Sequence, residues 1–255
     1  QLMGVLSKVD KFILIGDHNQ LATIVLQNEF SSAIEEQELL DIGVYDCRIS
    51  FFERLLQTCK KNQWKEAYVQ LKDQGRMHVD ISAFPAKFFY EENLFPIMDW
   101  QKDSLKLTDS NHGVMDSWVA NNRVLFLSTE KLKEVNTSNK INYNEANTIA
   151  ALVQSILRVY KESNSTLNTS QIGIIAPYRN QIALIKQQLA EAKIANYEEI
   201  SVDTVERYQG SQRDLILLSF CVNRPYQLDF LCNLNHDGTV DRKLNVALTR
   251  ARKQL

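Results

Sequence analysis

The chain has 255 residues, of which 44% are hydrophobic and 24% are charged, and its formal net charge is −2. This composition is ordinary for a globular protein with a buried core, and it excludes a highly charged disordered chain. Because the net charge is close to zero, no overall positive field attracts nucleic acid, so any such contact must come from a local group of residues.

The cysteines and the hydropathy of the chain indicate the cellular compartment in which the protein is expected. The four cysteines form no CxxC pair and have no histidine at zinc spacing, so we expect free thiols in a reducing compartment and no metal site. No apolar run approaches the length of a membrane span and no signal peptide is visible, so we expect a cytoplasmic protein without membrane contact. The chain starts at Gln1 and stops within a basic segment, and we therefore expect a fragment of a longer protein.

The first apolar run is KFILIG at residues 11–16, whose length and abrupt polar stop predict a buried parallel strand. DHNQL follows at residues 17–21. Because ligands gather at the carboxyl ends of strands in open α/β sheets, Asp17 and Gln20 are candidate site residues. Taken alone, a loop without function explains these residues about as well.

Residues 29–70 show a charged helical pattern, which predicts helices that cover a sheet or connect two domains. Residues 74–94 carry apolar side chains at helical spacing, and this spacing favours a core helix over a cofactor site: Ile81, Phe84, Phe88 and Phe89. Arg76 precedes them in a glycine-flanked turn, where a solvated arginine is the ordinary interpretation. Residues 96–118 have weak periodicity, so we expect a loop or a small excursion.

The rest of the chain alternates between short apolar runs and longer amphipathic segments. Strands are predicted at residues 123–128, 171–176, 200–202 and 215–220, helices at 144–161 and 182–192, and a polar loop at 203–213. Such alternation indicates βαβ units. We therefore predict an α/β fold with a parallel sheet flanked by helices.

Residues 241–252 (DRKLNVALTRAR) predict a helix with Asp241 as its N-cap. One face of this helix would be apolar: Leu244, Ala247, Leu248 and Ala251. Arg250 lies off that face, on the rim of the helix, where a planar and permanently charged guanidinium suits phosphate recognition. A surface helix with solvated basic residues is the alternative.

Several strings occur in a characteristic order: GDHNQL, FFERLL, QGRMH with FP and FY after it, N-x-x-EA at residues 142–146, IGIIAPYRNQ, VDTVERYQGSQRDLILLSF and LNVALTRAR. This series resembles superfamily 1 helicases, and in particular the branch of the nonsense-mediated-decay RNA helicases and the nuclease-helicases of Okazaki-fragment processing. VDTVERYQG is closest to the latter. Each string is weak evidence, but seven in the family's order over nearly the whole chain are specific.

The resemblance implies two RecA-like domains that sandwich ATP, of the P-loop NTPase type, with nucleic acid running across their tops. Residues 1–65 would be a C-terminal remnant of the first domain with connecting helices. Residues 66–255 would be the second RecA-like domain, truncated just after the arginine-finger helix. The missing first domain is then an expected partner.

The resemblance also implies roles for individual residues. Gln20 would sense the γ-phosphate and the attacking water, and Arg76 and Arg250 would be the two arginine fingers, which neutralise the γ-oxygens when the cleft closes. The remaining nucleotide contacts would come from Asp17, Gln74, Gly210 and Gln212. Thr204, Tyr178 and Arg179 match segments that face nucleic acid, where a hydroxyl and an arginine suit phosphates and a tyrosine can stack on a base. For Tyr178, packing within its loop is an equal alternative.

Two residues depart from the family pattern, and one motif is missing. Gly75 stands in place of a tyrosine that stacks on the nucleobase, and Gln212 in place of a glutamate that contacts the ribose. None of the eight glycines is followed by lysine, so the sequence has no GxxxxGK[ST] phosphate loop. In the family this loop and the Mg²⁺ ligands lie upstream, so ATP and Mg²⁺ are expected in an intact parent and no activity is expected of this chain alone.

Three hypotheses follow. The first is the C-terminal part of an ATP-dependent helicase motor that acts on single-stranded nucleic acid, with DNA favoured over RNA. The second is a degenerate RecA-like module that binds nucleic acid or a protein without hydrolysis, an alternative that Gly75 and Gln212 sustain. The third, a free-standing nucleotide enzyme of another class, is disfavoured by the missing phosphate loop.

Overall fold

The computed structural model describes residues 4, 6, 8–22, 25–109, 112–128, 138–235 and 238–255. The first part of the chain forms α2 (Glu29–Ser32), α3 (Gln37–Asp41), α4 (Phe51–Lys61), β1 (Asp73–Gln74), α5 (Val79–Phe89), β2 (Phe95–Pro96), η1 (Asp99–Lys102) and α6 (Val114–Asn121). The second part forms α7 (Tyr143–Glu162), η2 (Thr169–Gln171), β3 (Ile172–Ile175), α8 (Arg179–Glu191), η3 (Tyr197–Glu199), β4 (Ser201–Asp203), α9 (Val205–Tyr208), β5 (Arg213–Leu218), α10 (Gln227–Leu231), α11 (Arg242–Leu248) and β6 (Ala251–Gln254).

The centre of the molecule is a parallel sheet with the strand order β4-β3-β5-β6. Every residue of β3 is buried, as expected for a strand covered on both faces. In the register, Ile175 lies opposite Asp203 of β4 and opposite Leu218 of β5. The predicted α/β fold with a parallel sheet flanked by helices, of the RecA-like type, is confirmed.

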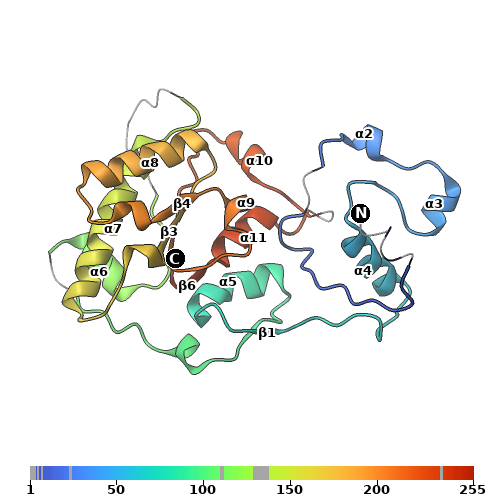
Figure 1. Cartoon of the computed structure of the whole chain (residues 1–255), viewed down its shortest axis with the longest axis horizontal. Helices are drawn as coiled ribbons and strands as arrows, with labels where there is room; N and C mark the ends of the chain where they lie inside the picture. The colour runs from blue at the N-terminus through green and yellow to red at the C-terminus, as the bar shows by residue number, and fades with distance from the viewer. Residues whose placement is uncertain are drawn as a thin grey trace.

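Successive residues of the strands point to opposite faces, and each face has its own apolar core. Ile174 and Leu215 pack in one cluster with side chains of α6, α7 and α8. Ile175 and Ile216 pack in the other cluster with side chains of α5, α9 and α11. Figure 1 shows these two groups of helices on either side of the strands. The predicted helix at residues 144–161 is α7, and the one at 182–192 is α8, which begins three residues earlier.

Gly173 of β3 allows α9 to pack tightly on the sheet. A Cβ at this position would lie 2.6 Å from the Tyr208 hydroxyl and 2.7 Å from Cδ1 of Ile216. The Tyr208 hydroxyl instead donates to the Ser201 carbonyl of β4. The glycine therefore lets a tyrosine cross one strand and bond to the next.

The chain before β1 lies beside the sheet domain, with α2, α3 and α4 at the right of Figure 1. Here the predicted strand at residues 11–16 is wrong. The segment pairs with no strand among the described residues, and Ile13 and Ile15 are each 88% exposed. An apolar run forms a buried parallel strand only where neighbouring strands pair with it and other elements cover its faces, and the described part of the chain places no strand beside it. The helical pattern that extends to residue 70 also ends earlier, at Lys61.

Four further predictions are corrected. Residues 123–128 are not a strand, although the Leu125 N–H donates to the Leu255 carbonyl beside the end of β6. Phe84 and Phe88 are exposed, because α5 buries only the face that carries Ile81 and Phe89. The polar stretch 203–213 contains the short helix α9, and the stretch 96–118 contains η1 and most of α6, with residues 110 and 111 outside the described residues.

The predicted helix at residues 241–252 is shorter than expected. Asp241 is its N-cap, accepting from the backbone N–H groups of Lys243 and Leu244, but the helix ends at Leu248. Its buried residues are Asn245, Val246 and Ala247, whereas Leu244 and Leu248 are only half-buried. The chain turns at Thr249 and Arg250 and enters β6. An apolar spacing in the sequence does not distinguish a long helix from a short helix followed by a strand.

The described helices include none that is long and apolar enough to span a bilayer. Cys47, Cys59, Cys221 and Cys232 are all free thiols. The described residues contain no cluster of three His, Cys, Asp or Glu side chains arranged to hold a metal ion.

Candidate active site

Arg250 lies in the turn between α11 and β6 and is one of the largest fully buried side chains, with 2% exposure. Its Nε donates to the Val246 carbonyl at 3.0 Å, and its Nη2 donates to Thr249 Oγ1 at 3.0 Å and to Gln20 Oε1 at 3.4 Å. The guanidinium is therefore held in one position by its own helix and directed at Gln20. A solvated arginine on a surface helix, the alternative at the sequence level, does not describe it.

Arg76 lies beside Arg250. The Gln74 side chain shapes the turn that presents it, since Gln74 Oε1 accepts from the backbone N–H of Arg76 at 3.0 Å and of Met77 at 2.8 Å. The Arg76 Nη1 donates to the Thr249 carbonyl at 3.1 Å, and its Nε donates to Gln212 Oε1 at 3.0 Å. Because Arg76 and Arg250 both bond to Thr249, the predicted pair of arginines comes together.

The two guanidiniums share a partly dehydrated site. Burial, and then the positive charge of Arg76, lowers the pKa of Arg250 to about 10. Burial also lowers the pKa of Arg76. The negative charge of Asp17 acts in the other direction on Arg250. Since the Asp17 carboxylate offsets at most one of the two charges, the pair of guanidiniums keeps net positive charge, which an anion would offset.

The turn of residues 17–20 is ordered by the Asp17 carboxylate. Its Oδ1 accepts from the Asn19 backbone N–H at 3.0 Å, and its Oδ2 accepts from Gln20 Nε2 at 2.7 Å. Because the Gln20 amide nitrogen is bound to Asp17, its oxygen is the atom that faces Arg250. Asp17 and Gln20 are therefore brought to the arginines.

Tyr90 and Asn245 complete this cluster, and sequence reasoning missed both. The Tyr90 hydroxyl donates to Asp17 Oδ2 at 2.6 Å and accepts from Asn245 Nδ2 at 3.0 Å. Burial, and then the charge of Asp17, raises the pKa of Tyr90 well above its ordinary value, so the phenol stays protonated. The sequence carries only a weak sign of this role: Tyr90 in FFYEE and Asn245 in LNVAL are polar residues next to apolar ones.

The residues predicted to meet nucleic acid lie apart from this cluster, whereas Gly210 adjoins it, since the carbonyl of the next residue, Ser211, accepts from Arg250 Nη1 at 3.4 Å. Gly210 has φ +84°, a left-handed conformation that favours glycine, in the turn between α9 and β5. Tyr178 and Arg179 follow β3, and Thr204 follows β4 as the residue before α9. Because β3 and β4 are neighbouring parallel strands, these three residues lie at the same edge of the sheet.

The two groups of predicted residues lie at opposite ends of the parallel strands. Tyr178, Arg179 and Thr204 follow carboxyl ends, whereas Gln212 and Arg250 immediately precede the first residues of β5 and β6. Arg179 is exposed and Tyr178 is half-buried at the start of α8. The structure thus separates the nucleotide residues from the nucleic-acid residues by the length of the sheet.

Comparison of the sequence with known proteins places this chain in a family. A family model described as "AAA domain" matches residues 47–255, which is most of the chain. The chain belongs to the superfamily 1 helicases, in their Dna2- and Upf1-like branch.

Individual relatives agree with this assignment. The DNA replication ATP-dependent helicase/nuclease DNA2 of Bos taurus is 30% identical over 278 residues, covering 99% of this chain and 23% of that protein. The Regulator of nonsense transcripts 1 homolog of Arabidopsis thaliana is 31% identical, covering 98% and 18%. Helicase sen1 of Schizosaccharomyces pombe is 29% identical, covering 96% and 13%. The chain spans less than a quarter of the length of these relatives.

The two departures from the helicase pattern have different structural settings. A Cβ at Gly75 would meet only Ile97, at 3.6 Å, so this position has room for a side chain. Gln212 is engaged, because its Oε1 accepts from Arg76 Nε. A neutral amide there orients Arg76 without offsetting its charge, as a carboxylate would.

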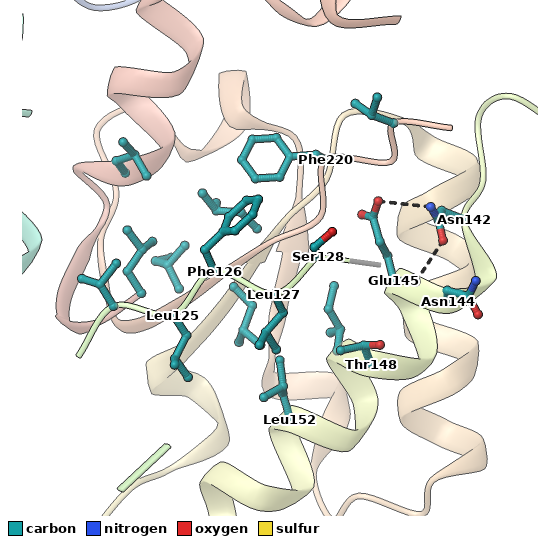
Figure 2. A pocket seen from close by; sticks show the side chains of 18 of the residues that line it. Leu125, Phe126, Leu127, Ser128, Asn142, Asn144, Glu145, Thr148, Leu152 and Phe220 are labelled. Atoms are coloured by element: carbon teal, nitrogen blue, oxygen red, sulfur yellow. Dashed lines mark hydrogen bonds between the residues drawn. The ribbon is translucent and has the colours of Figure 1, made fainter. Parts of the chain in front are cut away.

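A cavity in the described part of the helicase chain is distinct from the arginine cluster. It has a volume of about 970 Å³ and lies between α7, β5 and residues 125–128. Figure 2 shows Leu125, Leu127 and Leu152 directed into it, with Asn142 and Glu145 at its polar end. No residue of the predicted nucleotide or nucleic-acid sites lines it.

The N-x-x-EA string has a structural role at this polar end. Asn142 caps α7 by accepting from the Glu145 N–H at 3.0 Å. Glu145 Oε2 in turn accepts from Ser219 Oγ at 2.6 Å and from the Cys221 N–H at 2.8 Å. The fully buried Gln181, from the IGIIAPYRNQ string, donates to both Ser219 Oγ and the Asn142 carbonyl at 3.1 Å. These string residues therefore connect α7, α8 and the end of β5.

Proposed function

We propose that this chain is the arginine-bearing part of an ATP-dependent DNA helicase motor, and that it acts on ATP bound by a separate phosphate loop. The observation that carries the proposal is the placement of Arg76 and Arg250 on the same residue, Thr249, with Gln20 in contact with Arg250. This combination suits phosphoryl transfer, because the cations stabilise charge on the γ-phosphate while the glutamine orients water.

The energetics of the cluster support a role in the transition state. Arg250 is already buried and fixed by its own helix, so little side-chain freedom remains to be lost when a phosphate arrives. The pKa values of Arg250 and Arg76 are lowered by burial, so the site disfavours its own charge until an anion offsets it. An ATP-loaded cleft that closes on the arginines supplies that anion.

The partner in this scheme is a first RecA-like domain that carries the phosphate loop and the Mg²⁺ ligands. Residues 1–65 would belong to that domain and its connecting helices, and residues 66–255 would form the second domain. Exposed apolar side chains on the earlier part of the chain support a missing neighbour: Ile13, Ile15, Leu26, Phe30, Val69 and Leu71. Asp17, Gln74, Gly210 and Gln212 would complete the nucleotide contacts.

A single strand of DNA would bind at the opposite end of the sheet. Arg179 would contact phosphates, Thr204 would contribute a hydroxyl, and Tyr178 would stack on a base. A relative named for DNA replication matches over 99% of the chain, which supports DNA. ATP hydrolysis at one end of the sheet would then be coupled to movement of the strand at the other.

A non-hydrolysing module that binds nucleic acid or a protein is the second candidate. Gly75 and the bond between Gln212 and Arg76 favour it, since neither residue supplies the side chain that helicases use for the base or the ribose. The phosphate chemistry of Arg76 and Arg250 does not depend on those side chains, and for this reason the motor is preferred.

The test is Arg250→Ala in a protein that carries this chain together with a phosphate loop. We expect kcat for ATP hydrolysis to fall by about 10³–10⁵, as for other arginine fingers, with a much smaller change in KM. Arg250→Lys should restore little, because an ammonium lacks the forked contact of a guanidinium. A motor whose kcat survives Arg250→Ala would refute the proposal.

A control is needed because Arg250 is buried and its loss will lower the melting temperature. Arg158 of α7 is a suitable match, since it pairs with Asp116 at 2.7 Å on the far face of the sheet. Arg158→Ala should lower the melting temperature and leave kcat unchanged when both variants are assayed well below their melting points. A non-hydrolysing module would show no turnover even in the unaltered protein.

A further inference from the structure

A ring of hydrogen bonds, closed through the backbone of α11, includes the predicted catalytic side chains Gln20 and Arg250. From α11, Asn245 donates to the Tyr90 hydroxyl, and Tyr90 donates to Asp17. Asp17 accepts from Gln20, whose oxygen accepts from Arg250, and Arg250 donates back to the Val246 carbonyl of α11. The ring joins three separate segments: the turn of residues 17–20, the end of α5, and α11 with the turn after it.

The direction of each bond in the ring is set by chemistry. Asn245 Nδ2 donates to the Asn19 carbonyl at 2.8 Å as well as to Tyr90, so both of its hydrogens are used. Its buried Oδ1 has no hydrogen-bond partner among the described residues, so the two acceptors of Nδ2 are the groups that orient the amide. Since the Tyr90 oxygen accepts from Asn245, the phenolic hydrogen is free for Asp17.

A neutral donor is well suited to this position. Tyr90 holds the Asp17 carboxylate without adding a third positive charge beside Arg76 and Arg250. With one lone pair of Asp17 Oδ2 occupied by Tyr90, the Gln20 Nε2 bond to the same oxygen is confined to the remaining side. The Gln20 oxygen is thereby turned toward Arg250.

We propose that Tyr90 is a positioning residue that ties the Asp17–Gln20 turn to α11, so that Gln20 and Arg250 meet the γ-phosphate as one unit. This inference rests on the proposed function for its catalytic consequence, but not for its structural one. Tyr90 itself does not touch the nucleotide in this scheme. It acts through Asp17 on the orientation of Gln20.

The structural consequence is testable in the chain itself by amide hydrogen exchange. Tyr90→Phe removes one hydroxyl and keeps the ring, so we expect faster exchange at the amides of Asn19 and Gln20. Tyr160→Phe is the matched control, because the buried Tyr160 hydroxyl donates to Gln254 Oε1 at 2.9 Å, away from the cluster. Tyr160→Phe should leave exchange at residues 17–20 unchanged. Equal exchange at these amides in both variants would overturn the proposal.

The catalytic consequence is testable by a double-mutant cycle in a protein with a phosphate loop. Tyr90→Phe alone should lower kcat about ten- to a hundred-fold, the range for losing a hydrogen bond to a charged group, with little change in KM. In a Gln20→Ala background the same substitution should have almost no further effect, since Tyr90 acts through Gln20. A merely structural role would instead give the same loss in both backgrounds, and that result would overturn the inference.

The Arg250→Ala variant separates this inference from the proposed function. If Arg250→Ala keeps its kcat, the proposed function fails, and the exchange experiment still tests the role of Tyr90. If Arg250→Ala loses its kcat while Tyr90→Phe retains full activity, the motor stands and the positioning role of Tyr90 is refuted.

Discussion

Arg242 of α11 donates from Nη2 to both carboxylate oxygens of Glu53 in α4, at 2.9 and 2.8 Å. The Arg242 and Glu53 side chains are only 11% and 6% exposed. This buried ion pair therefore joins two segments that are far apart in the sequence. The Arg242 Nε also donates to the His18 carbonyl at 2.9 Å. The helix that leads to Arg250 thus holds both α4 and the turn of residues 17–20.

Glu53→Ala should lower the free energy of unfolding by about 3–5 kcal/mol, because it leaves the Arg242 charge buried without its partner. Denaturant titration of the two proteins measures the difference. Arg207→Ala is the control, since Arg207 and Asp203 form an exposed pair at 3.8 Å whose loss should change stability by less than about 1 kcal/mol. Equal effects of the two substitutions would contradict a buried, interlocking role for Glu53.

On its own, this chain should hydrolyse no ATP above background, with or without single-stranded DNA, because its sequence has no phosphate loop. Phosphate release from highly purified protein measures this. Turnover that disappears in Arg250→Ala would reveal a phosphate site within this chain and contradict the prediction. Turnover that survives Arg250→Ala would point to a contaminating enzyme.

Binding of single-stranded DNA to the edge with Arg179 and Thr204 should be weak and strongly salt-dependent, since it rests on few phosphate contacts. Arg179→Ala should reduce the slope of log affinity against log salt by about one. Fluorescence anisotropy over a range of salt concentrations gives the slope. Arg158→Ala, on α7, should leave it unchanged, and an unchanged slope in Arg179→Ala would move this arginine off the binding surface.

The free energy of unfolding should decrease at alkaline pH, and part of this decrease should come from ionisation of Cys221. Burial, and then the charge of Glu145, raises the pKa of this thiol from an ordinary value of 9.0 to about 12. The folded chain therefore holds the proton more tightly, and the stability that this contributes is present below about pH 9 and lost as the pH rises toward 12.

Urea titrations of Cys221→Ala at rising pH test this. Compared with the unaltered chain, the variant should lose less stability above about pH 9, because it has no thiol to ionise at this position. The buried tyrosines contribute equally to both proteins and cancel in the comparison. Cys47→Ala, at an exposed position, serves as the control. Parallel pH profiles for the unaltered chain and Cys221→Ala would exclude a contribution from this thiol.

Much of the sheet domain was predictable because its central strands are largely buried and its long helices are amphipathic. β3, β5 and α7 were read from continuous or periodic apolar residues, which depend only on local sequence. The segment at residues 11–16 has the same apolar character but lies exposed, since a strand also depends on neighbours that local sequence does not describe.

Only those residues of the candidate site that lie within the family's sequence motifs could be predicted. These motifs pointed to Arg76, Arg250 and Gln20, and the structure brings the three together. Tyr90 and Asn245 were missed because their importance comes from contacts with Asp17 and Asn19, which are distant in sequence. The burial of Arg250 was also missed, since an arginine in a basic string gives no sign of a dehydrated site.

Thr204 and Gln212 are close in sequence, yet one follows the carboxyl end of β4 and the other precedes the amino end of β5. The stretch between them runs the full length of the parallel strands, with Tyr208 anchored over Gly173 on the way. The number of residues in this stretch therefore sets the distance between the two sites, and an inserted or deleted residue would displace either Thr204 or Gln212. We expect evolution to vary exposed residues here, such as Glu206 and Arg207, while conserving their number.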